Sequence, residues 1–262
     1  MSRYLPPEIL DLVVDNLHDQ PTTLEACCVV SKSWIPRARR HLFAHVELNT
    51  FGPSIGLWMT VFPDPLNSPA HYTRTLTVTG LRFEAGTDDE VTPWLRAFYN
   101  VVDLRVETLG WSDPELFRGL SPNIRSLRLV APMTRPSAMF GLIYSFPLLE
   151  DLTLLSLSSE PGDDGWVIPS TLPTPTRSLL LSGGIGPVIR RLLDLQNAPH
   201  LTKIAFEFLY ETDFRLAMNL VSRCSGTLES LDITEVLLGA FPSPSVLYRY
   251  LTATIRASHD LV

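Results

Sequence analysis

The sequence is short of cysteine and of long apolar runs, and each shortage excludes a class of protein. It has three cysteines, two of which, Cys27 and Cys28, are adjacent, so neither a disulfide framework nor a zinc-ligand spacing is available. No apolar run approaches the ~18 residues that a membrane-spanning helix needs. Acidic residues interrupt the first apolar stretch, which therefore does not resemble a secretory signal. We expect a soluble protein of a reducing compartment, cytoplasmic or nuclear, with no membrane partner.

Positive charge is also scarce. The net charge is −7 and there is no basic tail, so the electrostatic footprint of a nucleic-acid partner is missing. Lysine occurs only at Lys32 and Lys203; of the 21 basic residues the other 19 (21 minus 2) are arginine. By contrast, 45% of the 262 residues are hydrophobic and 19% are charged, which is ample for a buried core.

The first fifty residues predict three short helices. Pro6 and Pro7 suit the first turn of a helix, where the missing backbone N–H costs no hydrogen bond, and apolar residues follow at helical spacing. These residues are Ile9, Leu10, Leu12, Val13, Val14 and Leu17. A capping-box pattern at residues 22–25 predicts a second helix, and apolar residues four apart from Trp34 onward predict a third. Three helices in about forty residues cannot hold a self-sufficient core, so they need a brace from outside.

This stretch resembles a known docking module. Leu-Pro-x-Glu-Ile-Leu at residues 5–10 is followed by an apolar helix, by Leu24 in a second helix, and then by Val30, a small residue and Trp34. The pattern resembles the F-box, by which substrate receptors join cullin-RING ubiquitin ligases. The resemblance covers about residues 4–45. It departs from the usual pattern in having two adjacent cysteines where bulkier aliphatic residues are common, and a serine where cysteine is frequent.

The resemblance implies a partner and a set of contact residues. The partner is the Skp adaptor and, through it, a cullin. The implied residues divide between the adaptor interface and the module's own packing: Leu5, Pro6, Ile9, Val13, Leu17, Leu24, Val30 and Trp34. A generic helical cap on the rest of the chain would use the same residues as core, and this alternative stays open.

The shortage of lysine has two explanations. Nucleotide bias favours arginine over lysine in many sequences, and this explanation needs no function. Alternatively, a protein that works beside a ubiquitin-transferring enzyme gains from presenting few acceptor amines.

A short apolar pattern recurs along the rest of the chain. Its central apolar positions are separated by 28, 23, 25, 27, 25 and 27 residues, which is the regular period of a repeat architecture. These positions are Leu76, Leu104, Leu127, Leu152, Leu179, Ile204 and Leu231. Helix-like stretches lie between them. Strand and helix at this period resemble the leucine-rich repeat over about residues 74–236, although the asparagine that usually turns the chain after each strand is absent.

These patterns predict an α/β protein in three parts. Residues 1–50 form the helical module, residues 51–73 form a linker with a capping helix at residues 54–62, and residues 74–262 form an irregular solenoid. The resemblance implies about seven strand-helix repeats, with parallel strands on the concave face and helices on the convex face. A further helix is predicted at residues 246–255.

Polar residues alternate with the buried positions of the predicted strands and are therefore expected on the exposed face of the sheet. The candidates for contact with a target protein are Asp103, Arg105, Arg128, Asp151, Lys203 and Asp232. Mixed charges suit a protein or peptide ligand, but a solvated sheet face without a ligand has the same pattern.

No pattern predicts catalysis or a cofactor. The glycine-rich turn at residues 183–186 lacks the lysine and hydroxyl of a phosphate-binding loop, and His41 and His45 have no third metal ligand nearby. We therefore expect a non-enzymatic protein without a cofactor or metal. The most specific expectation is a substrate-recognition subunit of an SCF-type ubiquitin ligase with an unidentified protein target. The alternative is a non-catalytic repeat scaffold with an F-box-like cap, acting outside a ligase.

Overall fold

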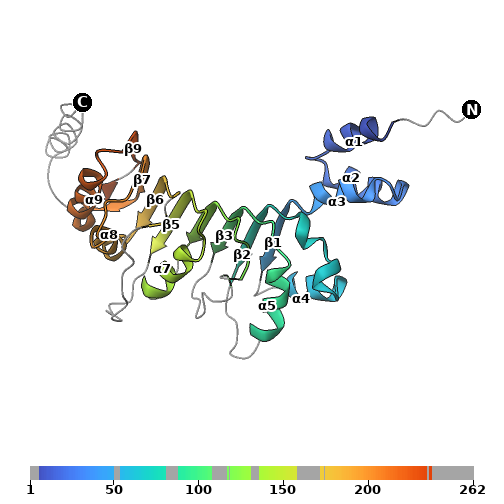
Figure 1. Cartoon of the computed structure of the whole chain (residues 1–262), viewed down its shortest axis with the longest axis horizontal. Helices are drawn as coiled ribbons and strands as arrows, with labels where there is room; N and C mark the ends of the chain where they lie inside the picture. Colours follow the sequence, from blue (N-terminus) through green and yellow to red (C-terminus); the bar gives the residue numbers. More distant parts are fainter. Residues whose placement is uncertain are drawn as a thin grey trace, which may run out of the picture.

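The computed structural model has an α/β architecture built around one long parallel sheet (Figure 1). It describes residues 6–49, 54–80, 88–107, 117, 119–130, 136–157, 172–173, 175–234 and 236–237. Eight strands pair in the order β1-β2-β3-β4-β5-β6-β7-β9, and every described neighbour is parallel. The predicted α/β class and parallel strands are confirmed.

Three short helices come first in the chain: α1 (Pro7–Asp15), α2 (Pro21–Val30) and α3 (Ile35–Leu42). Each has a proline at its first or second position, where no backbone hydrogen bond is lost. The capping box predicted at residues 22–25 is wrong, because α2 begins at Pro21 and the Gln20 side chain makes no capping hydrogen bond. Thr23 Oγ1 instead donates to the Gln20 side-chain oxygen at 3.3 Å.

The strands follow the predicted repeat. They are β1 (His45–Asn49), β2 (Thr75–Thr79), β3 (Asp103–Glu107), β4 (Ser126–Val130), β5 (Asp151–Leu157), β6 (Ser178–Gly183), β7 (Lys203–Glu207) and β9 (Ser230–Ile233). The seven predicted apolar positions pair in register from Leu76 to Leu231. The sheet nevertheless starts one strand earlier than predicted, because Val46 of β1 pairs with Leu76. The boundary expected at residue 50 therefore falls after the first strand of the sheet.

A repeated backbone hydrogen bond sets this register. Just before each strand, one carbonyl accepts from two successive N–H groups of the next repeat. The Arg74 carbonyl, for example, accepts from Val102 N at 2.8 Å and from Asp103 N at 3.0 Å. The same pairing starts at the Ala44 carbonyl and continues to the Thr202 carbonyl, which accepts from Glu229 and Ser230. Repeats of unlike sequence are thus held at one spacing by the backbone alone.

Helices cover one side of the sheet (Figure 1). They are α4 (Ser54–Val61), α5 (Asp88–Arg96), α7 (Pro136–Tyr144), α8 (Gly186–Leu193) and α9 (Glu211–Arg223), with 3-10 turns η1 (Pro65–Asn67) and η2 (Pro69–Tyr72). The short strands β8 (Leu209–Tyr210) and β10 (Val236–Leu237) form a second small sheet. One continuous core fills the space between the helices and the strands. The helix predicted at residues 246–255 lies outside the described residues.

An aromatic cluster joins the helical module to the sheet. The Phe43, Trp58 and Phe62 rings lie with centroids 4.9–6.0 Å apart, and Trp58 also meets Phe98, which is fully buried, at 5.6 Å. Phe43 caps α3, whereas Trp58 belongs to α4, the helix that was predicted to cover the first repeat. Figure 1 shows the three N-terminal helices at the β1 end of the sheet.

Candidate functional site

The three N-terminal helices carry an exposed apolar surface. Its members, which we call the N-terminal apolar surface, are Ile9, Leu12, Val13, Val29 and Val30, with exposed fractions of 44%, 57%, 46%, 88% and 70%. They lie on α1 and at the end of α2. Their exposure follows from the size of the module, whose fully buried core is limited to Val14, Leu24, Cys27 and Ala38. Two of those four side chains are small, so they cover little of the helices' apolar area.

The residues implied by the resemblance divide into two groups. Pro6, Ile9, Val13 and Val30 are exposed, whereas Leu24 is buried and Leu17 and Trp34 pack partly buried against the module core. Leu5 lies outside the described residues. The implied set omitted Leu12 and Val29. A signal for Leu12 was present, because it widens the apolar stripe of the first helix beyond one face.

An ion-paired cluster holds α1 against α3. Asp15 accepts from Arg37 Nε at 2.6 Å and from a second guanidinium nitrogen, which makes a bidentate pair. His41 Nε2 donates to Asp15 Oδ1 at 2.7 Å. The hydrogen bond from Arg37, followed by that from His41, holds the pKa of the Asp15 carboxyl well below its usual range. The cluster fixes the direction in which α1 presents Ile9 and Val13.

The second surface is the side of the sheet that faces away from the helices. We call it the open face: it comprises the strand residues that alternate with the buried ones. The six residues predicted for target contact all lie on it: Asp103, Arg105, Arg128, Asp151, Lys203 and Asp232. Alternation therefore places them on one surface, but two groups form, because β3 to β5 carry the first four and β7 and β9 carry the others.

Charge on the open face is arranged around an apolar centre. Arg105 and Arg128 pair in register on neighbouring strands, and Arg105 is neutralised by Asp103 at 2.9 Å. Within the described part of the chain, no ion pair is formed by Arg128, which is exposed. Between the two charged groups, Leu180 and Ala205 are paired on β6 and β7 and are only partly buried.

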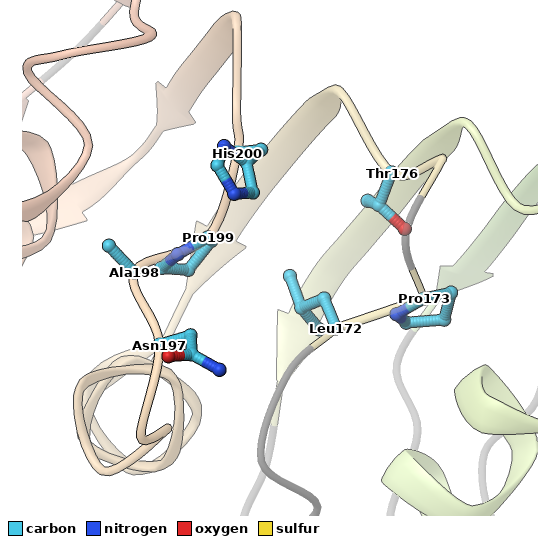
Figure 2. Close-up of a pocket in the computed structure, with 7 residues that line it drawn as sticks. All are labelled: Leu172, Pro173, Thr176, Asn197, Ala198, Pro199 and His200. Carbon is cyan, nitrogen blue, oxygen red and sulfur yellow. The ribbon is translucent and has the colours of Figure 1, made fainter.

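A pocket of about 390 Å³ lies between the segments that enter β6 and β7 (Figure 2). Its lining is Leu172, Pro173, Thr176, Asn197, Ala198, Pro199 and His200. None of these lining residues is acidic, lysine or arginine. The Thr176 hydroxyl already donates to the Leu149 carbonyl at 3.0 Å. The lining therefore has no pair of groups that could share acid–base work.

The glycine-rich turn has an acidic neighbour. Gly183 ends β6 with a φ of 86°, and Gly186 begins α8. The Asp213 carboxylate of α9 packs so closely on Gly186 that a Cβ there would have to displace it. A carboxylate at the start of the helix complements the helix dipole and repels a phosphate. The geometry thus favours a structural turn over a phosphate cradle.

Comparisons with known proteins add no family. The sequence matches no protein-family model, and no curated protein matches it at a significant level. Across the described ranges, no helix is both long enough and apolar enough to cross a membrane. Function is therefore inferred from the two surfaces.

Proposed function

We propose that this chain is the substrate-recognition subunit of an SCF-type cullin-RING ubiquitin ligase. The three N-terminal helices act as an F-box that docks onto the Skp adaptor, and the open face of the sheet binds a target protein. The observation that carries the proposal is the N-terminal apolar surface on a module with four fully buried core residues. Ile9, Leu12 and Val13 are 44–57% exposed, so a partner that covers them gains for each roughly half of the ~1.5–3 kcal/mol that full burial of such a side chain is worth.

The target-binding part of the proposal treats the sheet as an irregular leucine-rich-repeat solenoid. Neighbouring parallel strands are ~4.8 Å apart, whereas packed helices need about 10 Å between their axes, so a stack of repeats bends with its strands on the inside. The open face then becomes concave and can surround a target segment. The charges at Arg128 and Asp232 flank its apolar centre.

The mechanism is tethering rather than catalysis. One chain that holds both the adaptor and the target raises the effective concentration of target amines at a separate ubiquitin-transferring enzyme. The aromatic cluster at Trp58 supports this role, because it fixes the module to the sheet instead of leaving a flexible linker between them.

The alternative function is a repeat scaffold with an F-box-like cap that works outside a ligase. Leu17, Leu24 and Trp34 pack within the module, as the core of any helical cap requires. The two functions differ in the role of the exposed residues. Ile9 and Val13 contact the adaptor in a ligase subunit, whereas in a scaffold cap they do not.

Adaptor binding by the purified chain distinguishes the ligase subunit from the scaffold. The double variant Ile9→Asp/Val13→Asp should weaken Skp adaptor binding by at least ~30-fold, since buried apolar anchors contribute on the order of 2 kcal/mol or more. Leu66→Asp is the matched control, because Leu66 is 88% exposed in η1, outside α1 and α2, and should bind as wild type. Absence of adaptor binding by the wild type, or equal binding by the double variant, would refute the proposed function.

A further inference from the structure

The open face of the sheet carries more acidic than basic side chains. Asp103 and Arg105 neutralise each other at 2.9 Å. Of the other charged residues on the described strands of this face, five are acidic and two are basic, and none of them forms an ion pair there, so negative charge is in excess. The acidic residues are Glu47, Glu107, Asp151, Glu207 and Asp232, and the basic residues are Arg128 and Lys203.

A strip of apolar residues crosses the same face on four consecutive strands. Its members, which we call the apolar strip, are Val130, Leu155, Leu180 and Ala205, all of them partly buried. Val130 pairs in register with Leu155, and Leu180 pairs with Ala205. Leu155 comes two residues after Thr153, the register partner of Leu180, so the two pairs are diagonal neighbours. Side chains at such positions are close enough to act together, so the strip forms one apolar surface.

A carboxylate stands in register at each end of the apolar strip. Glu107 pairs with Val130, and Asp232 pairs with Ala205; both acidic side chains are exposed. Glu107 on β3 and Asp232 on β9 are separated by five strand spacings, which is roughly 24 Å at ~4.8 Å per spacing. An extended protein segment covers that distance in about seven residues at ~3.3 Å per residue.

The two basic residues do not reverse the sign of this face. Arg128 has Glu107 and Asp151 diagonally across from it on β3 and β5, and Lys203 has Asp232 diagonally across from it on β9. Each cation thus has a carboxylate on a neighbouring strand. The excess carboxylates have no basic counterpart on the described part of the face, so a ligand that complements it brings positive charge.

We infer that the open face binds an extended protein segment of about seven residues, with a cationic side chain at each end and apolar side chains between them. This ligand class deepens the target-binding part of the proposed function and rests on it. The apolar strip covers the central side chains, and burial of apolar area supplies affinity. The carboxylates at Glu107 and Asp232 select the positively charged ends and repel acidic or phosphorylated segments.

The test is a selection of random heptapeptides displayed on phage against the immobilised full chain, with no adaptor present. The wild type should enrich peptides that have Lys or Arg at both ends and apolar residues in the middle. Glu107→Gln/Asp232→Asn should lose this enrichment. Asp19→Asn/Glu25→Gln is the matched control, because it removes the same two charges from exposed positions outside the sheet, and it should select as the wild type does.

Two further measurements separate selective recognition from general attraction to an acidic protein. Glu107→Lys/Asp232→Lys should reverse the selection, so that peptides with acidic ends are enriched. A fluorescein-labelled peptide from the wild-type selection should bind Glu107→Gln/Asp232→Asn about three- to ten-fold more weakly at low salt, since two exposed ion pairs are lost. The difference should shrink as salt rises.

No enrichment of basic-ended peptides by the wild type, an unchanged selection by the charge-reversed variant, or equal loss in the control variant would overturn the inference. Because the selection contains no adaptor, its result is independent of the adaptor-binding experiment. Adaptor binding without basic-ended enrichment would overturn this ligand class and leave the docking role intact. Enrichment without adaptor binding would refute the ligase role and still support the ligand class.

Discussion

The helical module and the sheet bury their apolar residues to very different extents. The sheet shares one core that extends from Val46 to Cys224, and the interiors of β1 to β7 are almost fully excluded from solvent, whereas Leu231 and Ile233 of β9 are partly buried. The module packs around Val14, Leu24, Cys27 and Ala38 and leaves Leu12 and Val29 exposed. The sheet region also leaves single large apolar side chains exposed, among them Leu66, Tyr99 and Phe208, whereas in the module five exposed apolar residues accompany a buried core of four. This contrast supports the proposal that a partner covers the module.

The largest effect is expected in the sheet core. Leu127 lies on β4 with no exposed surface and is flanked in register by Leu104 and Leu152. Leu127→Ala should lower the free energy of unfolding by about 2–5 kcal/mol, because neighbouring repeats cannot collapse into the cavity. Urea denaturation followed by circular dichroism measures the change. A loss below ~1 kcal/mol would show that the repeats pack loosely. The sheet core would then be no better packed than the core of the helical module.

A substitution in the module core should act locally. Leu24 is buried in the small cluster, so Leu24→Ala should open α1 to α3 while the sheet stays folded, because the two cores are separate. Hydrogen exchange resolved by peptide should show faster exchange, by about ten-fold or more, in residues 6–42 only. Equally faster exchange in β2 to β7 would mean that the two regions unfold as one unit.

The ion-paired cluster should contribute less and depend on pH. The Asp15 side chain is 31% exposed, so Asp15→Asn should cost the module about 1 kcal/mol or less, a discounted value for a partly solvated pair. The folded-state pKa of Asp15 is depressed from its ordinary 3.8, so its stabilisation is fully present above about pH 4 and is lost as pH falls further. The stability difference between wild type and variant, from thermal melts at pH 5 and pH 3, should shrink at pH 3. A difference that grows on acidification would contradict the assignment.

The smallest effect is expected on the open face. Arg128 is exposed beside Arg105, so Arg128→Ala removes a like-charge contact and should change the free energy of unfolding by less than ~0.5 kcal/mol. Thermal denaturation at low salt is the measurement. Destabilisation above ~1 kcal/mol would show that Arg128 serves the fold, and would remove it from the candidate target contacts.

Much of the sheet was predictable because a large aliphatic residue that recurs at a steady period indicates a buried position in a strand. Leucine or isoleucine marks all seven predicted strands, and each pairs in register as expected. β1 was missed because it carries Val46 and Leu48 at a spacing of 30 residues from the next strand (76 minus 46), outside the pattern of the other repeats.

The candidate docking site was only partly predictable. Helical spacing indicates which residues share a face, but not which face a neighbour covers, so it could not separate buried Leu24 from exposed Val30. The cluster of Asp15, Arg37 and His41 was not predicted at all. It joins positions 22 and 26 residues apart, and such pairings depend on how α1 crosses α3.

Hydrogen exchange of the whole chain, with and without purified Skp adaptor, tests most directly whether the N-terminal helices, and not the open face, bind the adaptor. We predict slower exchange on α1 and at the end of α2, around Ile9, Val13 and Val30, and no change along the strands of the open face. Unaltered exchange throughout, or protection found on β3 to β9 instead, would contradict the assignment of docking to the N-terminal helices.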